Sequence, residues 1–237
     1  MQASTWAIPP RRYPFLDAID YAVSELGIES FASLDNGVTY GEQALYAIAK
    51  PELRAGVLAD VRLTRPRDQI LNMLELAAAW PGVRVVDGDA LAEPTAREVG
   101  EVDAVLLLNV LLHAVAPDWD QVLAQFAPRT RCFVIGQPQW VASPRTVRLN
   151  ELPRDEWAEA MPDSIAGSDI LERLGEWFAP QGRPLRDART LWQWGITDAD
   201  LEARLGSLGF ALAHRIDHGG FAGTTAFANR TLVFRRG

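Results

Sequence analysis

Five short apolar segments alternate with stretches of helical spacing through the first 140 residues of the chain. The apolar segments are 31–35, 55–60, 83–89, 103–110 and 132–136, and the helical stretches are 40–50, 66–80, 90–100 and 117–127. Four of the apolar segments carry apolar residues at consecutive positions, as expected of strands covered on both faces. Strands that alternate with helices form βαβ units. The alternation therefore predicts an α/β fold, with helices on both faces of a mostly parallel sheet.

The two ends of the chain depart from this alternation. Residues 15–27 have helical spacing and end at a glycine, which predicts an N-terminal helical segment within residues 1–30. The chain closes with a helix over 198–209, a strand over 210–217, a glycine-rich turn at 218–223 and a strand over 225–236. Because two strands joined by a short turn are antiparallel, the predicted sheet has seven strands, of which the last is antiparallel.

A long segment, 141–197, separates the fifth strand from this closing unit. It contains several prolines and four of the eight tryptophans, with helix-like pieces at 155–161 and 168–178. Long connections in compact domains usually have a functional role. We expect one domain over residues 1–237, in which 141–197 is an insert that covers a substrate.

Composition excludes several classes of function. The 23 basic and 31 acidic residues give a net charge of −8, which argues against a nucleic-acid-binding surface. The single cysteine cannot form an internal disulfide or a four-cysteine zinc site. No apolar run reaches the roughly 18–20 residues of a membrane helix, and the first residues lack a signal-peptide pattern. These features predict a cytoplasmic protein, monomeric or homodimeric, with no membrane or nucleic-acid partner.

Polar residues follow four of the predicted strands, at the ends where an open parallel sheet binds ligands. The residues at these strand ends are Asp35, Gly37, Thr39 and Gly41, then Asp60, then Asp89 and Ala90, and finally Asn109. Glycines let a ligand approach the backbone closely, and the Asp60 carboxylate can accept two hydrogen bonds from a ribose diol. Four polar strand ends along one edge predict a ligand site there.

This ordered set resembles the class I S-adenosylmethionine-dependent methyltransferases, particularly their small-molecule branch, over residues 28–236. The family's acidic residue and G-x-G-x-G motif match at Asp35, Gly37 and Gly41, with Thr39 in place of the middle glycine. Its G-D-A motif matches at 88–90, and its fourth motif, similar to D-x-V-x-x-x-N-V-L-H-H, matches at 103–115.

The resemblance implies a Rossmann-like fold, S-adenosylmethionine as cofactor and methyl transfer to a small organic acceptor. It places Asp60 on the ribose and Asp89 on the adenine amino group. The other cofactor-binding residues that it implies are Asp35, Gly37, Thr39, Gly41, Ala90 and Asn109.

Two other functions stay open at this point. Thr39 adds a side chain where the methionine part of the cofactor belongs, which favours a non-catalytic binding module that retains the fold. Tyr46 and Lys50 have the spacing of the catalytic pair of short-chain dehydrogenases, which would make the protein a nicotinamide-dependent oxidoreductase. No G-x-G-x-x-G motif precedes that pair, so we interpret Tyr46 as a core aromatic residue.

Methyl transfer by direct displacement depends mainly on holding the acceptor in line, and few side chains need to react. An acceptor hydroxyl would benefit from a base, and a free imidazole titrates near pH 6.5. His113 and His218 are the candidate catalytic bases, both at the carboxyl edge of the predicted sheet.

Acceptor-binding candidates come from the end of the fifth strand and from the insert. Gln137 follows the fifth strand with Gln139 close behind, and Trp192 and Trp194 form an aromatic wall. No metal is expected, because His214 and His218 lie about 13 Å apart on an extended chain.

Overall fold

The computed structural model describes residues 15–34, 42–60, 78–162 and 169–237. Its central sheet has seven strands in the order β10-β11-β5-β4-β1-β2-β3. They are β1 (Ser30–Leu34), β2 (Ala55–Asp60), β3 (Val83–Asp87), β4 (Val102–Leu108), β5 (Thr130–Trp140), β10 (Phe210–Gly220) and β11 (Phe227–Arg236). The pairs among β1 to β5 are parallel, and β11 lies antiparallel between β5 and β10. The predicted fold class, including the antiparallel last strand, is confirmed.

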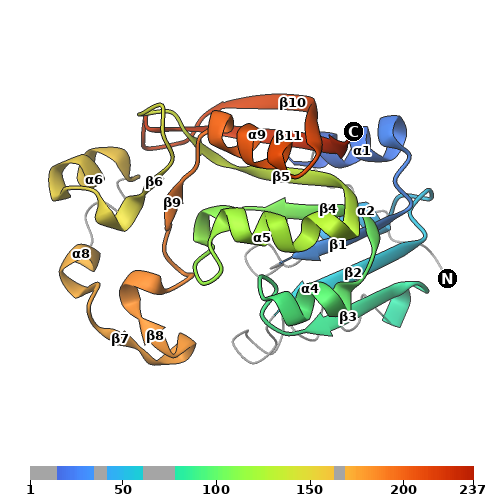
Figure 1. Ribbon diagram of the computed structural model, residues 1–237, viewed down its shortest axis with the longest axis horizontal. Helices are drawn as coiled ribbons and strands as arrows, with labels where there is room; N and C mark the ends of the chain where they lie inside the picture. Colours follow the sequence, from blue (N-terminus) through green and yellow to red (C-terminus); the bar gives the residue numbers. More distant parts are fainter. Residues whose placement is uncertain (1–14, 35–41, 61–77, 163–168) are drawn as a thin grey trace, which may run out of the picture.

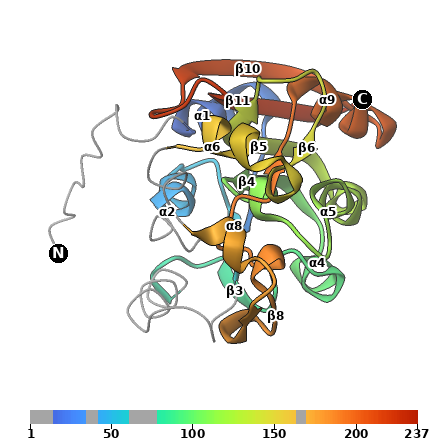
Figure 2. The ribbon, with the colours of Figure 1, turned by 90° about the vertical axis from the view of Figure 1, so that its left-hand side faces the viewer.

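Helices cover both faces of the sheet (Figure 2). One face carries α1 (Leu16–Leu26) and α2 (Glu42–Ile48), and the other carries α4 (Glu93–Val99), α5 (Trp119–Phe126) and α9 (Asp198–Ser207). In α1 the buried residues include Ile19, Ala22 and Val23, which share one side at helical spacing. Gly27 ends this helix in the left-handed conformation, at φ 61°. The helix expected over 66–80 lies almost entirely outside the described residues.

Two strands are longer than their sequence patterns indicate. The strand expected over 132–136 is β5, which continues to Trp140, so Gln137 lies within a strand rather than after it. The strand expected over 210–217 is β10, which continues to Gly220, so the predicted turn at 218–223 begins too early. In both cases β11 supplies the partner, because its residues Ala228 and Arg230 pair with the ends of both strands.

The segment between β5 and α9 forms a lobe of short elements beyond the carboxyl ends of the parallel strands (Figure 1). Its elements are β6 (Val147–Arg148), α6 (Arg154–Ala160), α8 (Ile170–Arg173), β7 (Trp177–Phe178), β8 (Arg183–Pro184) and β9 (Trp194–Gly195). The helical piece expected over 168–178 is only the four residues of α8, and β7 follows it as an extended strand. Strand β6 pairs with β9, and β7 pairs with β8.

Short 3₁₀ turns join several elements of the sheet and of the lobe. They are η3 (Leu111–His113), η4 (Ala127–Arg129), η5 (Leu149–Glu151), η6 (Ala179–Gln181) and η7 (Leu185–Asp187).

Among the residues described, no helix combines the length and the apolar character that a membrane span requires.

Candidate functional site

The glycine-rich loop of the predicted site lies outside the described residues. This concerns Asp35, Gly37, Thr39 and Gly41. Asp60 is placed as the last residue of β2, where its backbone pairs with that of Asp87 at the end of β3. Its position at the carboxyl edge agrees with the prediction, although its side chain is not described.

Asp89 follows β3 at the same edge of the sheet. Its Oδ1 accepts a hydrogen bond from the backbone N–H of Leu91 at 3.1 Å and forms an ion pair with Nη1 of Arg189. Its Oδ2 receives no hydrogen bond from the described residues, and the side chain is 33% exposed. Asp89 therefore presents one occupied and one available carboxylate oxygen at the carboxyl edge.

Ala90 and Asn109 occupy different kinds of position. The side chain of Ala90 is 4% exposed and packs into the core beneath α4 and α5. Asn109 follows β4 with φ at 58°, and its N–H donates to the carbonyl of Gly136 at 2.7 Å. A non-glycine residue with positive φ is uncommon, and such residues concentrate at functional sites. Asn109 therefore supports a ligand site at the end of β4.

His113 closes the 3₁₀ turn that follows β4. Its Nδ1 lies 2.7 Å from the carbonyl oxygen of Leu191, in the lobe. A carbonyl oxygen can only accept a hydrogen bond, so Nδ1 is the protonated nitrogen. In the neutral ring the lone pair then resides on Nε2. The lobe thus fixes the tautomer of the predicted base.

His218 lies in β10 rather than in a turn, with its Nε2 2.8 Å from the hydroxyl oxygen of Thr231. Burial lowers the pKa of its imidazole. Strands β11 and β5 separate β10 from β4, so His218 is about 14 Å from the strand that leads to His113. The two predicted bases are therefore not brought together.

Gln137 and Gln139 are both 0% exposed, and within the described part of the chain none of their four amide oxygen and nitrogen atoms has a hydrogen-bond partner. They lie two residues apart in β5, so their side chains share one face of the strand. A buried amide without a partner costs about 1–3 kcal/mol. Four unpaired atoms at the carboxyl end of β5 support the prediction that this position serves a ligand.

Replacing Gln137 by methionine should stabilise the protein. The change keeps the length of the side chain and removes two unpaired polar atoms, so we expect a gain of about 1 kcal/mol and a Tm rise of about 2–4 °C. Differential scanning calorimetry measures the shift. Gln193→Met is the matched control, because both amide atoms of the equally buried Gln193 are hydrogen-bonded and this change should lower the Tm. A lower Tm in both variants would contradict the expectation.

Trp192 and Trp194 have different surroundings. Trp192 packs edge-on against Phe221 and Phe227, with ring centroids 5.2 Å apart in each pair. The indole N–H of Trp194 donates to the carbonyl of Ala114 at 2.7 Å, and the ring lies against the core beneath α5. Trp194 therefore anchors the lobe to the loop after β4, whereas Trp192 packs the lobe against the hairpin of β10 and β11.

The segment from Ala188 to Thr197 crosses the carboxyl edge of the sheet (Figure 1). Its bonds include the N–H of Trp140 to the carbonyl of Ile196 at 2.8 Å and the N–H of Gln193 to the carbonyl of Leu112 at 2.8 Å. We call this stretch, residues 188–197, the seam. Gln193 and Arg189 could not be predicted as site residues, because nothing in the local sequence pattern distinguishes a buried glutamine or one arginine among many.

Tyr46 and Lys50, the dehydrogenase-like pair, form a cluster with Asp20 of α1. The Tyr46 hydroxyl lies 2.8 Å from Oδ2 of Asp20, Lys50 Nζ donates to that hydroxyl at 3.0 Å, and Lys50 is ion-paired with Asp20. Burial raises the pKa of Tyr46, whereas an acid–base tyrosine requires a lowered pKa. The cluster joins α1 to α2 and gives no support to the oxidoreductase alternative.

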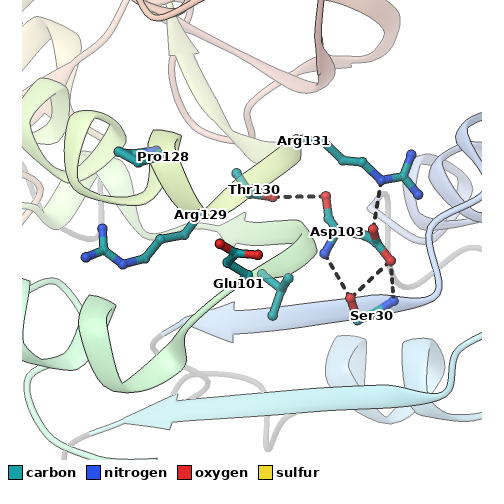
Figure 3. Close-up of a pocket in the computed structure, with 8 residues that line it drawn as sticks. Ser30, Glu101, Asp103, Pro128, Arg129, Thr130 and Arg131 are labelled. Carbon is teal, nitrogen blue, oxygen red and sulfur yellow. Dashed lines mark hydrogen bonds and ion pairs between the residues drawn. The ribbon is translucent and has the colours of Figure 1, made fainter.

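An open pocket of about 340 Å³ lies at the opposite, amino edge of the sheet (Figure 3). Asp103 at its centre accepts hydrogen bonds from Ser30 and from Nε of Arg131, at 3.0 and 2.7 Å. Burial raises the pKa of Asp103, but these bonds outweigh it and leave the pKa lowered. The network joins β1, β4 and β5, so we interpret it as structural. Within the described ranges, no three His, Cys, Asp or Glu side chains form a metal site.

No protein-family model and no curated protein sequence matches this chain. Solved structures do resemble it. The N-terminal domain of EvdMO1, crystallised with S-adenosylhomocysteine (SAH), is 16% identical, with a TM-score of 0.56 over 95% of this chain and 81% of that chain. A 1,6-didemethyltoxoflavin-N1-methyltransferase from Burkholderia thailandensis is 15% identical, with a TM-score of 0.58 over 95% of this chain and 79% of that chain. A protein described as a pericyclic reaction enzyme is 16% identical, with a TM-score of 0.51 over 94% of this chain and 47% of that chain. At these identities the likeness shows the fold alone.

Proposed function

We propose that this chain, which has the fold of the class I S-adenosylmethionine-dependent methyltransferases, binds S-adenosylmethionine and transfers its methyl group to a small organic molecule. Asp89 is the observation that carries the proposal. Its carboxylate follows β3 at the position of the G-D-A motif and is partly exposed. One of its oxygens is available to accept a hydrogen bond from the adenine amino group. Because one fold can host different reactions, the proposal rests on this site as well as on the architecture.

Described residues at the ends of β3 and β4 support the proposed cofactor site. Asp89 would accept a hydrogen bond from the adenine amino group. Asn109, with its positive φ, would present its backbone to the cofactor at the end of β4. Asp60, at the end of β2 beside β3, is the ribose ligand in this proposal. Ala90 would contribute through its backbone, because its side chain is buried in the core. Asp35, Gly37, Thr39 and Gly41 complete the proposed set on the evidence of the motif alone.

The acceptor would lie between the end of β5 and the lobe. Gln137 offers unpaired amide atoms there, and Trp192 and Trp194 provide the aromatic wall. The bound cofactor supplies an electrophilic methyl group. If the acceptor is a hydroxyl, His113 is the proposed base that takes up its proton, while the lobe holds Nδ1. We assign the base to His113 alone, because His218 is three strand spacings away from β4.

Calorimetry with three ligands tests the proposal. The chain should bind S-adenosylmethionine and SAH, and NADPH should give no signal. Binding of NADPH without either sulfur ligand would support an oxidoreductase instead. Binding of none of the three would favour the alternative raised by Thr39, in which the fold is retained as a binding module without catalysis.

A further inference from the structure

Arg189 reaches from the lobe to the adenine end of the proposed cofactor site. Its guanidinium pairs with Oδ1 of Asp89 and donates to the carbonyls of Val115 and Ala116 at 3.3 and 3.2 Å. Its backbone N–H donates to Oε1 of Gln181 at 2.8 Å. The Arg189 side chain is only 16% exposed. The residue is therefore held at both ends, by the lobe and by the edge of the sheet.

The ion pair with Arg189 occupies one carboxylate oxygen of Asp89 and leaves the other available to a ligand. Oδ1 takes both the guanidinium and the Leu91 N–H, so the carboxylate is fixed from two directions. A carboxylate held in this way offers Oδ2 as its remaining acceptor. An amino group can donate a hydrogen bond to that oxygen. A carbonyl oxygen in the same place has no hydrogen to donate, so the two oxygens would repel each other.

The same seam that carries Arg189 also contacts the loop after β4 at three more points. Leu191 accepts from Nδ1 of His113, Gln193 donates to the carbonyl of Leu112, and Trp194 donates to the carbonyl of Ala114. The seam therefore spans from the proposed base to the proposed adenine ligand. Any displacement of the lobe would therefore move both His113 and Asp89.

We propose that Arg189 is a positioning residue, which orients Asp89 for the adenine amino group and so makes nucleobase selectivity depend on the position of the lobe. The inference rests on the proposed function. It goes beyond it by giving a residue of the insert control over the cofactor site, through an ion pair whose partners are 100 positions apart.

The test compares SAH with S-inosylhomocysteine, in which a 6-oxo group replaces the adenine amino group. Calorimetry on the wild-type chain should give at least about tenfold tighter binding of SAH, because the oxo group cannot donate to Asp89. In Arg189→Ala this ratio should fall to within about threefold of unity. Arg189→Lys should restore part of it, since lysine keeps the charge but lacks the planar fork of donors.

Arg183→Ala is the matched control. Arg183 lies in the same lobe and donates to the same Val115 carbonyl at 3.3 Å, but it makes no bond to Asp89. This variant should keep the wild-type ratio. Thermal unfolding of each variant establishes that it is folded, and Arg189→Lys provides the test if Arg189→Ala does not fold.

Each contrary result has a distinct meaning. If Arg189→Ala weakens both ligands equally, the residue has only a structural role and the proposal fails. If Arg189→Ala tightens SAH, Arg189 competes with adenine for Asp89, and the proposal is again wrong. If the wild-type chain binds neither ligand, the proposed function itself fails, and the positioning role fails with it.

Discussion

Replacing His113 by asparagine should lower methyl-transfer turnover at least about a hundredfold, because general-base assistance contributes about 10²–10⁴ to rate. Asparagine can still donate a hydrogen bond to the Leu191 carbonyl from its amide, which takes the place of Nδ1 at 2.7 Å. It cannot accept the proton of an acceptor hydroxyl. The variant thus separates the basic role of His113 from its role in holding the lobe.

The measurement is SAH release with a hydroxyl-bearing acceptor found by screening phenols and hydroxy acids. The affinity for SAH, determined by calorimetry, should be unchanged. His218→Asn is the control, because His218 is hydrogen-bonded to Thr231 within the sheet. This variant should retain most of the wild-type turnover. If His113→Asn keeps most of the wild-type rate, then the reaction depends on positioning alone.

Replacing Asp89 by alanine should weaken SAH binding about tenfold to a hundredfold, the effect of leaving a buried polar group unpaired. The change removes the proposed acceptor of a hydrogen bond from the adenine amino group and also leaves the Arg189 guanidinium without its carboxylate. Both effects disfavour adenine. Calorimetry with SAH measures the loss.

Glu93→Ala is the control for that experiment. Glu93 is an exposed carboxylate in the first turn of α4, four residues from Asp89, and it pairs with Arg97 towards solvent. The Glu93→Ala variant should bind SAH with the affinity of the wild-type chain. Equal SAH affinities in Asp89→Ala and the wild-type chain would remove Asp89 from the site.

The way β5 ends shows why the sequence misplaced Gln137. The pattern Gln-Pro-Gln indicates a loop, because proline cannot donate to a sheet. Strand β4, however, ends at Leu108, which pairs with Gly136, so β4 does not continue beside β5 beyond that point. Trp140 donates on that side to Ile196 of the seam. Pro138 is tolerated because its missing N–H lies on the side of β5 where pairing with β4 has already ended.

The end of β10 was mispredicted for a related reason. His218, Gly219 and Gly220 have the composition of a turn, but β11 continues to pair as far as Ala228 opposite Gly220. The pairing shifts register between Asp217 and Gly220, and Gly219 takes a φ of 88°. Glycine adopts this conformation without strain, so the strand continues through a bulge.

The sequence by itself determined the sheet and the strand ends at which the proposed site lies. Consecutive apolar residues in 103–110, and the alternation of such segments with helices, are local patterns, and they placed Asp89 and Asn109 at one edge. Only the tertiary structure decided how the lobe meets that edge. The bonds from Arg189 to Asp89 and from Leu191 to His113 join residues 100 and 78 positions apart. Such contacts leave no periodicity in the sequence, because they depend on where the folded chain returns, and this is why the arginine that holds the proposed adenine ligand became visible only in the fold.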